Sequence, residues 1–250
     1  MNYDQLERTY WQNQSQRIGK ILGRVNELGS VSSGRVIPSE EDLLLGEGRR
    51  LSLAVMFLDV SGFSSRPSYT DAEQSVNLQV LNLFFSEMVR IAEDYGGVVE
   101  KNTGDGLLGY FEDGGGTPPA PATKRAVACA LTMMATAEYV VNPILRNSGV
   151  PDITFRVSID YGPVTLALLG AARRFNSVVA IGTTANFASK MLANARPGEI
   201  VLGATAKLQL PITWQDEFVR LALLETGWTY TLTGLPYPLY RYNGRWNQVF

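Results

Sequence analysis

The feature that most constrains the fold is a nearly continuous apolar run, Leu51 to Val60 (LSLAVMFLDV), with Asp59 near its end. Runs of this length and character form strands in the middle of a sheet that is covered on at least one face. A helix is predicted next, from a cap at Asp71 to Tyr95-Gly96-Gly97. Its apolar positions recur at helical spacing: Leu78, Leu81, Phe85, Met88, Val89 and Ala92.

Three further segments complete a recognisable order. A hairpin is predicted from Val98–Lys101, a tight turn over Asn102-Thr103-Gly104-Asp105-Gly106, and Leu107–Phe111. A second long helix over Arg125–Ile144 and a strand over Thr154–Ile159 follow. The order β-α-β-β-α-β predicts an α+β, ferredoxin-like sheet with both helices on one face.

The remaining segments flank this unit. An arm over Val164–Leu169, a short strand before Gly182, a helix over Thr184–Ala193, a strand over Glu199–Leu202 and Tyr-rich C-terminal strands extend it. Residues 3–28 carry the apolar spacing of a helix, which either packs on the domain surface or contacts a partner. We therefore predict a helical extension over 1–29, a linker over 30–50 and the main domain over 51–250.

Composition excludes several kinds of chemistry. The 22 Lys and Arg nearly balance the 24 Asp and Glu, which argues against a nucleic-acid or polybasic membrane binder. With no histidine and a single cysteine, Cys129, the chain has no Ser-His-Asp triad, HExxH zinc site or CxxC metal knuckle. The polar N-terminus lacks a signal-peptide core, and the apolar stretch Val164–Ala172 is too short to span a bilayer. A cytoplasmic location without membrane insertion is expected.

Two aspartates are the main candidates for chemistry. Asp59 lies where the buried strand ends, and Asp105 lies on the turn of the neighbouring hairpin, so their carboxylates can converge. Paired carboxylates without Cys or His suit Mg²⁺ or Mn²⁺, and Gly62 would let backbone amides approach a phosphate. Taken singly, Asp59 also fits a helix or turn cap, and Asp105 fits an ordinary turn.

Four blocks together carry a family resemblance. They are FLDVSGFS (57–64), EKNTGDGLL (100–108), FRVSIDYGPV (155–164) and AIGTTANFASKM (180–191). In this order and spacing they resemble the catalytic domain of class III nucleotidyl cyclases, over about residues 50–205. The resemblance implies a nucleoside triphosphate bound between two identical protomers arranged head to tail, with two divalent metal ions.

The resemblance also implies residue roles. Asp59, the carbonyl of Val60 and Asp105 match the family's metal ligands. Gly62 and Phe63, which follow Asp59 closely, are candidate substrate-binding residues. Asn186 and Lys190 match the Asn that orients the ribose and the Arg that neutralises the α-phosphate. Lys190 replaces a planar fork with a point charge. A solvated helix face is the alternative interpretation of Asn186 and Lys190.

The chain departs from the purine cyclases at the base pocket. The two base-selecting positions are occupied by Lys101, which suits adenine, and Val179, which accepts no hydrogen bond. Leu235 stands near the place of the family's phosphate-binding lysine. Arg173 or Arg174 could replace that lysine, or could serve only surface solubility.

This combination resembles the pyrimidine cyclases of bacterial anti-phage (Pycsar) systems. That likeness implies UTP as substrate and cyclic UMP as the product, which a separate effector would read. Phe57, on the same strand face as Asp59, is a candidate wall for a one-ring base, or an ordinary core residue. The alternatives are a cytidylate cyclase, an adenylate cyclase with an altered base pocket, and a non-catalytic nucleotide-binding sensor.

Overall fold

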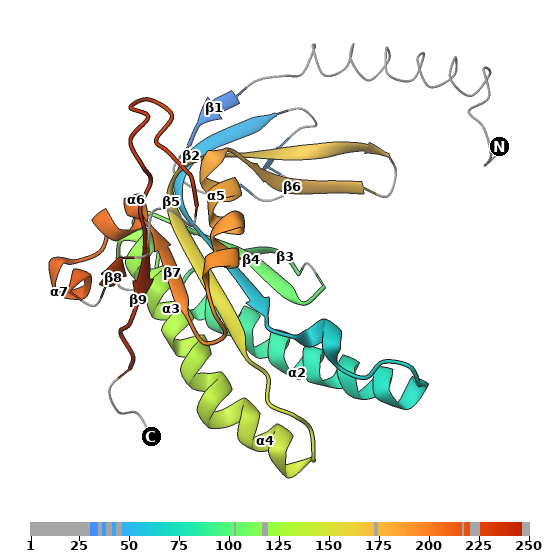
Figure 1. The fold of residues 1–250 in the computed structure, drawn as a ribbon. Helices are drawn as coiled ribbons and strands as arrows, with labels where there is room; N and C mark the ends of the chain where they lie inside the picture. Colours follow the sequence, from blue (N-terminus) through green and yellow to red (C-terminus); the bar gives the residue numbers. More distant parts are fainter. Residues whose placement is uncertain are drawn as a thin grey trace. The chain divides into compact units, whose positions relative to one another are not determined.

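The structure is a computed structural model that describes residues 31–34, 37–38, 42–43, 47–102, 104–116, 120–172, 175–216, 218–220 and 226–246 (Figure 1). The predicted helix over 3–28 and the residues Arg173 and Arg174 lie outside the described residues. The chain divides into two compact units. The larger comprises residues 52–164 and 182–250, and the smaller comprises residues 1–51 and 165–181.

The larger unit contains a sheet in the order β3-β4-β2-β5-β7-β9-β8. Its first four strands, with the helices between them, follow the chain as β2-α2-β3-β4-α3-β5, which is the predicted β-α-β-β-α-β order. The strand bounds are β2 Gly48–Val60, β3 Val98–Asn102, β4 Gly106–Glu112, β5 Phe155–Ala172, β7 Ile200–Gly203, β8 Phe218–Arg220 and β9 Leu239–Tyr242. The α+β fold class and the additional C-terminal strands are therefore confirmed.

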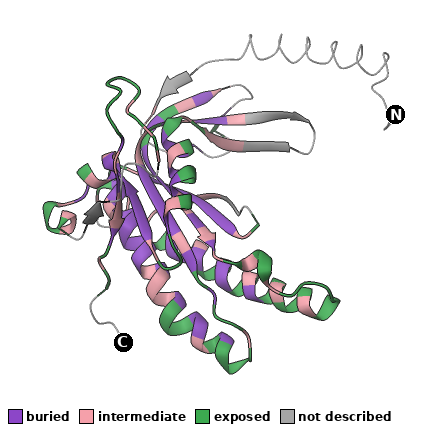
Figure 2. Ribbon diagram, viewed as in Figure 1, coloured by how far each residue is buried: buried purple, intermediate pink, exposed green. Residues whose placement is uncertain are grey.

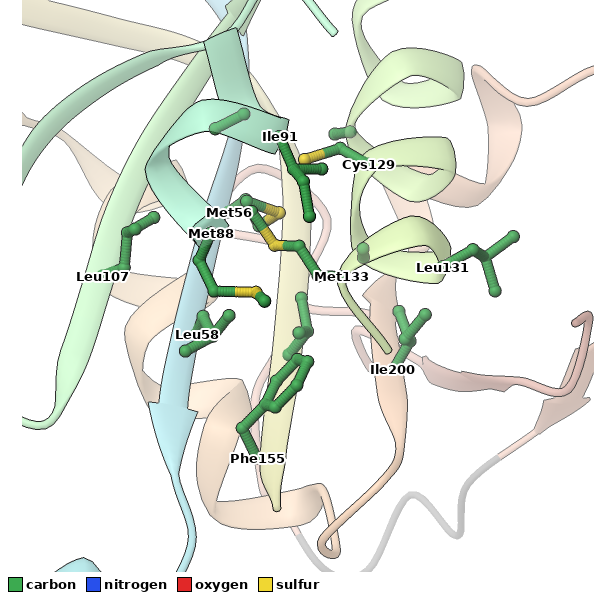
Figure 3. Packing of buried hydrophobic residues seen from close by; sticks show 14 of the residues in the cluster. Met56, Leu58, Met88, Ile91, Leu107, Cys129, Leu131, Met133, Phe155 and Ile200 are labelled. Carbon is green, nitrogen blue, oxygen red and sulfur yellow. The ribbon is translucent and has the colours of Figure 1, made fainter. Parts of the chain in front are cut away.

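Helices α2 (Asp71–Asp94) and α3 (Ala122–Thr136) pack on one face of this sheet. Ala54, Met56, Leu58 and Val60 of β2 belong to the core cluster that includes both helices, and Figure 2 shows by colour that much of β2 is buried. The side chains of Met56, Met88 and Met133 meet between sheet and helices in Figure 3. The opposite face of β2 carries Phe57 and Asp59, which are only partly buried. Strand alternation therefore places the candidate site on the face away from α2 and α3.

Helix α2 differs from the prediction at its first turns. Its cap is Thr70, whose side chain accepts from the backbone N–H of Glu73 while the Glu73 carboxylate accepts from the N–H of Thr70. Asp71 is the first helical residue, so the predicted cap was one residue late. Leu78 is 60% exposed because the buried face of α2 begins only at Val80.

The second long helix extends further than predicted. α3 continues through a π-helical turn, Ala137–Val141, into α4, Asn142–Asn147. Among the described residues, Ala122–Asn147 is the one helix long and apolar enough to cross a membrane. Its α3 part is buried against the sheet, which is the packing of a core helix.

Strand β5 joins two segments that the sequence analysis treated separately. The predicted strand and the predicted arm form one strand, Phe155–Ala172, and β6 (Phe175–Ile181) pairs with its outer half in the smaller unit. In the same unit β1 (Val31–Ser33) pairs in parallel with the start of β2. The larger unit also contains α5 (Thr183–Met191), α6 (Ala204–Leu208) and α7 (Ile212–Gln215), with short 3₁₀ turns at Phe63–Ser65 and Leu192–Asn194.

Candidate active site

Asp59 and Asp105 are brought together by the pairing of β2 with β4. Asp59 lies opposite Gly106, the neighbour of Asp105 in the chain. The backbone N–H of Val60 donates to the carbonyl of Asp105 at 2.8 Å. Both aspartates are partly exposed, whereas Val60 is buried. The strand end therefore presents two carboxylates one register position apart, as hard oxygen donors at the edge of the core.

Arg156 is a site residue that the sequence analysis missed. It lies on β5, the strand next to β2, and its Nε donates to Oδ2 of Asp59 at 2.9 Å. Its Nη2 lies 2.8 Å from the same oxygen, with the two side chains 33% and 26% exposed. The β-α-β-β-α-β order puts these strands side by side, and alternation in FRVSIDYG puts Arg156 on the face of Asp59. Strand order and alternation together could have identified Arg156 as a site residue from the sequence.

The turn after β2 is held in a fixed shape. Gly62 has φ +68°, a conformation that a residue with a Cβ rarely adopts. The Ser65 hydroxyl donates to the Gly62 carbonyl at 2.7 Å. Arg66 donates to the carbonyls of Pro151 and Asp152 and lies 5.6 Å from the ring centroid of Phe63. Gly62 and Phe63 thus belong to an ordered loop directly beyond Asp59.

The hairpin places two predicted base-pocket residues in one row of the sheet. Leu108 of β4 lies opposite Phe57 on one side and opposite Lys101 on the other. This row is two residues from Asp59 along β2. A β-bulge shifts the register of β3 between Val99 and Lys101.

The bulged residue is Glu100. Its carboxylate accepts a hydrogen bond from the hydroxyl of Tyr110, a buried residue of β4. The row that contains Phe57 and Lys101 is therefore bordered by an acid–phenol pair, which sequence reasoning did not identify.

Helix α5 presents the other predicted catalytic residues. Asn186 and Lys190 are both exposed and lie four residues apart, on one face of the helix. The opposite face is buried through Thr184, Ala185, Ala188 and Met191. The helix is thus amphipathic, with its two candidate side chains directed to solvent within the single chain.

The remaining predicted residues lie elsewhere. Val179 is on β6 of the smaller unit, opposite Ala167, and is partly buried. Leu235 is 63% exposed in a turn whose backbone is closed by the N–H of Tyr230 donating to the Leu235 carbonyl at 2.8 Å.

A buried acid lies further along β5. Asp160 is 2% exposed, and its Oδ1 accepts from Tyr237 at 2.7 Å, Thr205 at 2.8 Å and the backbone N–H of Tyr161 at 2.9 Å. Burial raises the pKa of Asp160 to about 6, against the hydrogen bonds, which lower it. The carboxyl borders a cavity of about 350 Å³ that also contacts Phe187 of α5.

The comparison with known families decides the assignment. Residues 48–222 match the family described as the Adenylate and Guanylate cyclase catalytic domain. The chain belongs to the class III nucleotidyl cyclases. It therefore contains a nucleotide cyclase catalytic domain, and cyclases of this family use divalent metal ions.

Curated relatives of this cyclase domain differ in the substrate that they are named for. An uncharacterized protein of Mycobacterium bovis is 30% identical over 192 residues, covering 73% of this chain and 32% of its own length. A uridylate cyclase of Rhodovulum sp. is 25% identical over 175 residues, covering 69% of this chain and 71% of its own length. An adenylate cyclase of Anabaena cylindrica is 24% identical, covering 60% and 29%. The chain thus spans about a third of the length of the mycobacterial relative.

Solved structures agree on the fold. The adenylyl cyclase CyaB from P. aeruginosa superposes with a TM-score of 0.64 at 23% identity, covering 82% of this chain and all of that one. The guanylyl cyclase Cya2 gives the same TM-score at 21% identity, covering 81% and 96%. At this identity the likeness establishes the architecture of the cyclase fold and nothing about the base.

Proposed function

We propose that this chain is a metal-dependent cyclase that converts UTP into 3′,5′-cyclic UMP and pyrophosphate. The observation that supports the cyclase chemistry is the position of Asp59 and Asp105 on neighbouring ends of paired strands, with Arg156 ion-paired to Asp59. The choice of a pyrimidine is supported by Phe57, which lies in the row of Lys101 two residues from Asp59, and by the uridylate cyclase among the relatives.

The donor set fits a pair of hard divalent cations. Two partly exposed carboxylates lie at adjacent strand ends, and the Arg156 ion pair uses only Oδ2 of Asp59, which leaves Oδ1 for a cation. Asp59, Asp105 and the Val60 carbonyl would hold Mg²⁺ or Mn²⁺. When bound, such ions lower the pKa of the ribose 3′-hydroxyl and offset the charge of the triphosphate.

The reaction joins the ribose O3′ to the α-phosphorus and breaks the bond between that phosphorus and the β-phosphate oxygen. Pyrophosphate leaves, and the proton of the 3′-hydroxyl passes to solvent. Asn186 would orient the ribose, and Lys190 would offset the charge that grows on the α-phosphate. Arg156, which is ion-paired with Asp59, would also bind an oxygen of the triphosphate.

The site is proposed to form between two copies of the chain arranged head to tail. Asp59 and Asp105 would come from one protomer, and Asn186 and Lys190 from its partner. Support comes from the exposure of Asn186 and Lys190 on α5. Each chain carries both halves, so a homodimer would hold two sites and would require no second subunit.

The pyrimidine proposal is tested with a mixture of the four nucleoside triphosphates and Mn²⁺, with the products separated by chromatography. Cyclic UMP as the main product supports it. Cyclic CMP would change the base within the pyrimidine class, and cyclic AMP would overturn it.

An adenylate cyclase is the second candidate, favoured by Lys101 and by the Anabaena relative. Tight binding of a triphosphate without pyrophosphate release would instead indicate a nucleotide sensor.

If cyclic UMP is the product, we propose that it serves anti-phage defence as a cytoplasmic second messenger read by a separate effector. The proposed boundaries of the extension, linker and cyclase domain stay at 1–29, 30–50 and 51–250.

A further inference from the structure

Helix α5 is fastened to strand β5 at both of its ends. Near the end of the helix, the Ser158 hydroxyl donates to the carbonyl of Ala188 at 2.5 Å. Near its start, the Thr184 hydroxyl donates to the carbonyl of Pro163 at 3.1 Å. One hydroxyl comes from the strand and the other from the helix, so the two bonds prevent α5 from sliding along β5 in either direction.

The bond at Ser158 is made where water is excluded. Ser158 and Ala188 are both fully buried. The N–H of Leu192 donates to the carbonyls of Ser189 and Lys190 as the helix tightens into a 3₁₀ turn. The Ala188 carbonyl lies in the last helical turn, where carbonyls commonly lack an intrahelical partner. A buried carbonyl needs a donor, and Ser158 supplies one.

Close packing reinforces the bond at Thr184. A Cβ added at Gly162 would lie 2.7 Å from the Thr184 hydroxyl oxygen. Glycine at 162 therefore lets the first turn of α5 approach β5 closely enough for the hydrogen bond to form.

The same face of β5 also carries Arg156, the partner of Asp59. Arg156 precedes Ser158 by two residues and forms the ion pair with Asp59. Two residues along a strand span about 7 Å. One short, regular stretch of β5 thus connects Asp59 with the helix that carries Asn186 and Lys190.

We propose that Ser158 and Thr184 are positioning residues that fix α5 relative to the Asp59 edge of the same chain. This inference rests on the proposed function for its catalytic consequence. In a head-to-tail dimer, the offset between α5 and the Asp59 edge determines how each chain's Lys190 meets its partner's metal edge. A small displacement of α5 would misplace Lys190 at both sites.

The structural part is tested by hydrogen–deuterium exchange on the full chain, independently of any activity. Ser158→Ala and Thr184→Val should each raise amide exchange in residues 183–191 and leave α3 unchanged. Thr184→Ser, which keeps the hydroxyl, should behave as the wild type. Thr123→Val is the matched control, because Thr123 is equally buried and, within the described part of the chain, its hydroxyl has no partner.

The catalytic part is tested by a double-mutant cycle with Lys190→Ala. Ser158→Ala should lower kcat about tenfold with little change in KM, since misplacement of a catalytic group by less than 1 Å has effects of this order. In the Lys190→Ala background the same change should have almost no further effect. A merely structural loss would lower activity equally in both backgrounds.

Each outcome decides between the two claims. Unchanged exchange in α5, or exchange that rises equally in α3, overturns the positioning role. If amide exchange rises only in α5 but the kinetic effects of Ser158→Ala and Lys190→Ala are additive, the proposed effect of α5 positioning on catalysis is overturned. Selective exchange in a chain that cyclises none of the four nucleotides supports the fastening of α5 and refutes the proposed function.

Discussion

The two candidate halves of the site differ in how complete they are within one chain. At the end of β2, the Asp59 carboxylate is held by its ion pair with Arg156, and the Val60 N–H donates to the backbone carbonyl of Asp105. On α5, the buried face is fixed to the sheet, yet Asn186 and Lys190 extend into solvent. Under the proposed function, the residues around Asp59 would form one half of the site within a single chain, and Asn186 and Lys190 would act on the partner chain.

The largest effect is expected from a substitution of Asp59, which tests the half of the site at the end of β2. Asp59→Asn should lower cyclase activity by about 10³-fold, because it removes a charged donor to cations that supply several kcal/mol of transition-state stabilisation. The measurement is cyclic nucleotide formed per minute with saturating Mn²⁺. Asp94→Asn, which removes only an exposed ion pair with Arg90, is the control and should leave activity unchanged. Equal loss in both variants would refute the role of Asp59.

Removing the charge of Lys190, which is exposed on α5, should have the next largest effect. Lys190→Ala should lower kcat by about 10²-fold, the usual cost of one donor to a developing charge. Lys190→Arg keeps the charge and should retain most of the activity. Thermal unfolding should be the same for all three proteins, since Lys190 is exposed. An active Lys190→Ala variant would favour the solvated-face interpretation of α5.

The preference for a pyrimidine over a purine base tests the role of Phe57, which lies two residues from Asp59 on β2. Phe57→Ala should raise the ratio of kcat/KM for ATP to that for UTP by about tenfold, because the space left beside Leu108 would admit a second ring. Leu53→Ala, on the same face of β2 but six residues from Asp59, controls for loss of packing and should leave the ratio unchanged. An unchanged ratio in Phe57→Ala would make Phe57 an ordinary core residue.

The smallest expected effect concerns Asp160, which lies on β5 outside both halves. Its pKa is raised from 3.8 to about 6 in the folded chain, so the folded state binds the proton more strongly than the unfolded state. The resulting stabilisation is present below pH 3.8 and is lost as pH rises through about 6. Tyr237 and Tyr230 face it and have raised pKa values, so neither titrates in this range.

Asp160→Asn should therefore flatten the dependence of the free energy of unfolding on pH between 4 and 6. Urea unfolding at several pH values measures this dependence. An unchanged slope would show that Asp160 does not titrate there.

Much of the architecture could be predicted because it follows from local patterns. The apolar run of β2, the hairpin around Asp105 and the spacing of Asn186 and Lys190 each identify an element, and strand order then brings Asp59 and Asp105 together. The first turns of α2 were less predictable. Helical spacing assigned Leu78 to the buried face, but burial depends on where the sheet beneath the helix ends. The Thr70–Glu73 capping box was visible in the sequence and was overlooked in favour of Asp71.

The contacts of β5 could not be read from its motif alone. Arg156, Ser158 and Asp160 alternate on one face, but their partners are 97, 30 and 77 residues away in the chain. Only the strand order and the packing of α5 determine which of these pairs meet. Likewise, the hydrogen bond between Tyr110 and Glu100 depends on a β-bulge that no pattern in the sequence predicts.

The central claim is that the two halves work across two copies of the chain, and mixing two inactive variants tests it most directly. An Asp59→Ala chain and a Lys190→Ala chain are combined in equal amounts under conditions that exchange subunits. If pairing is random, half of the dimers contain one of each and have one intact site, so about a quarter of wild-type activity should return. Mixed dimers, verified by distinguishable tags, that remain as inactive as the separate variants would contradict the account.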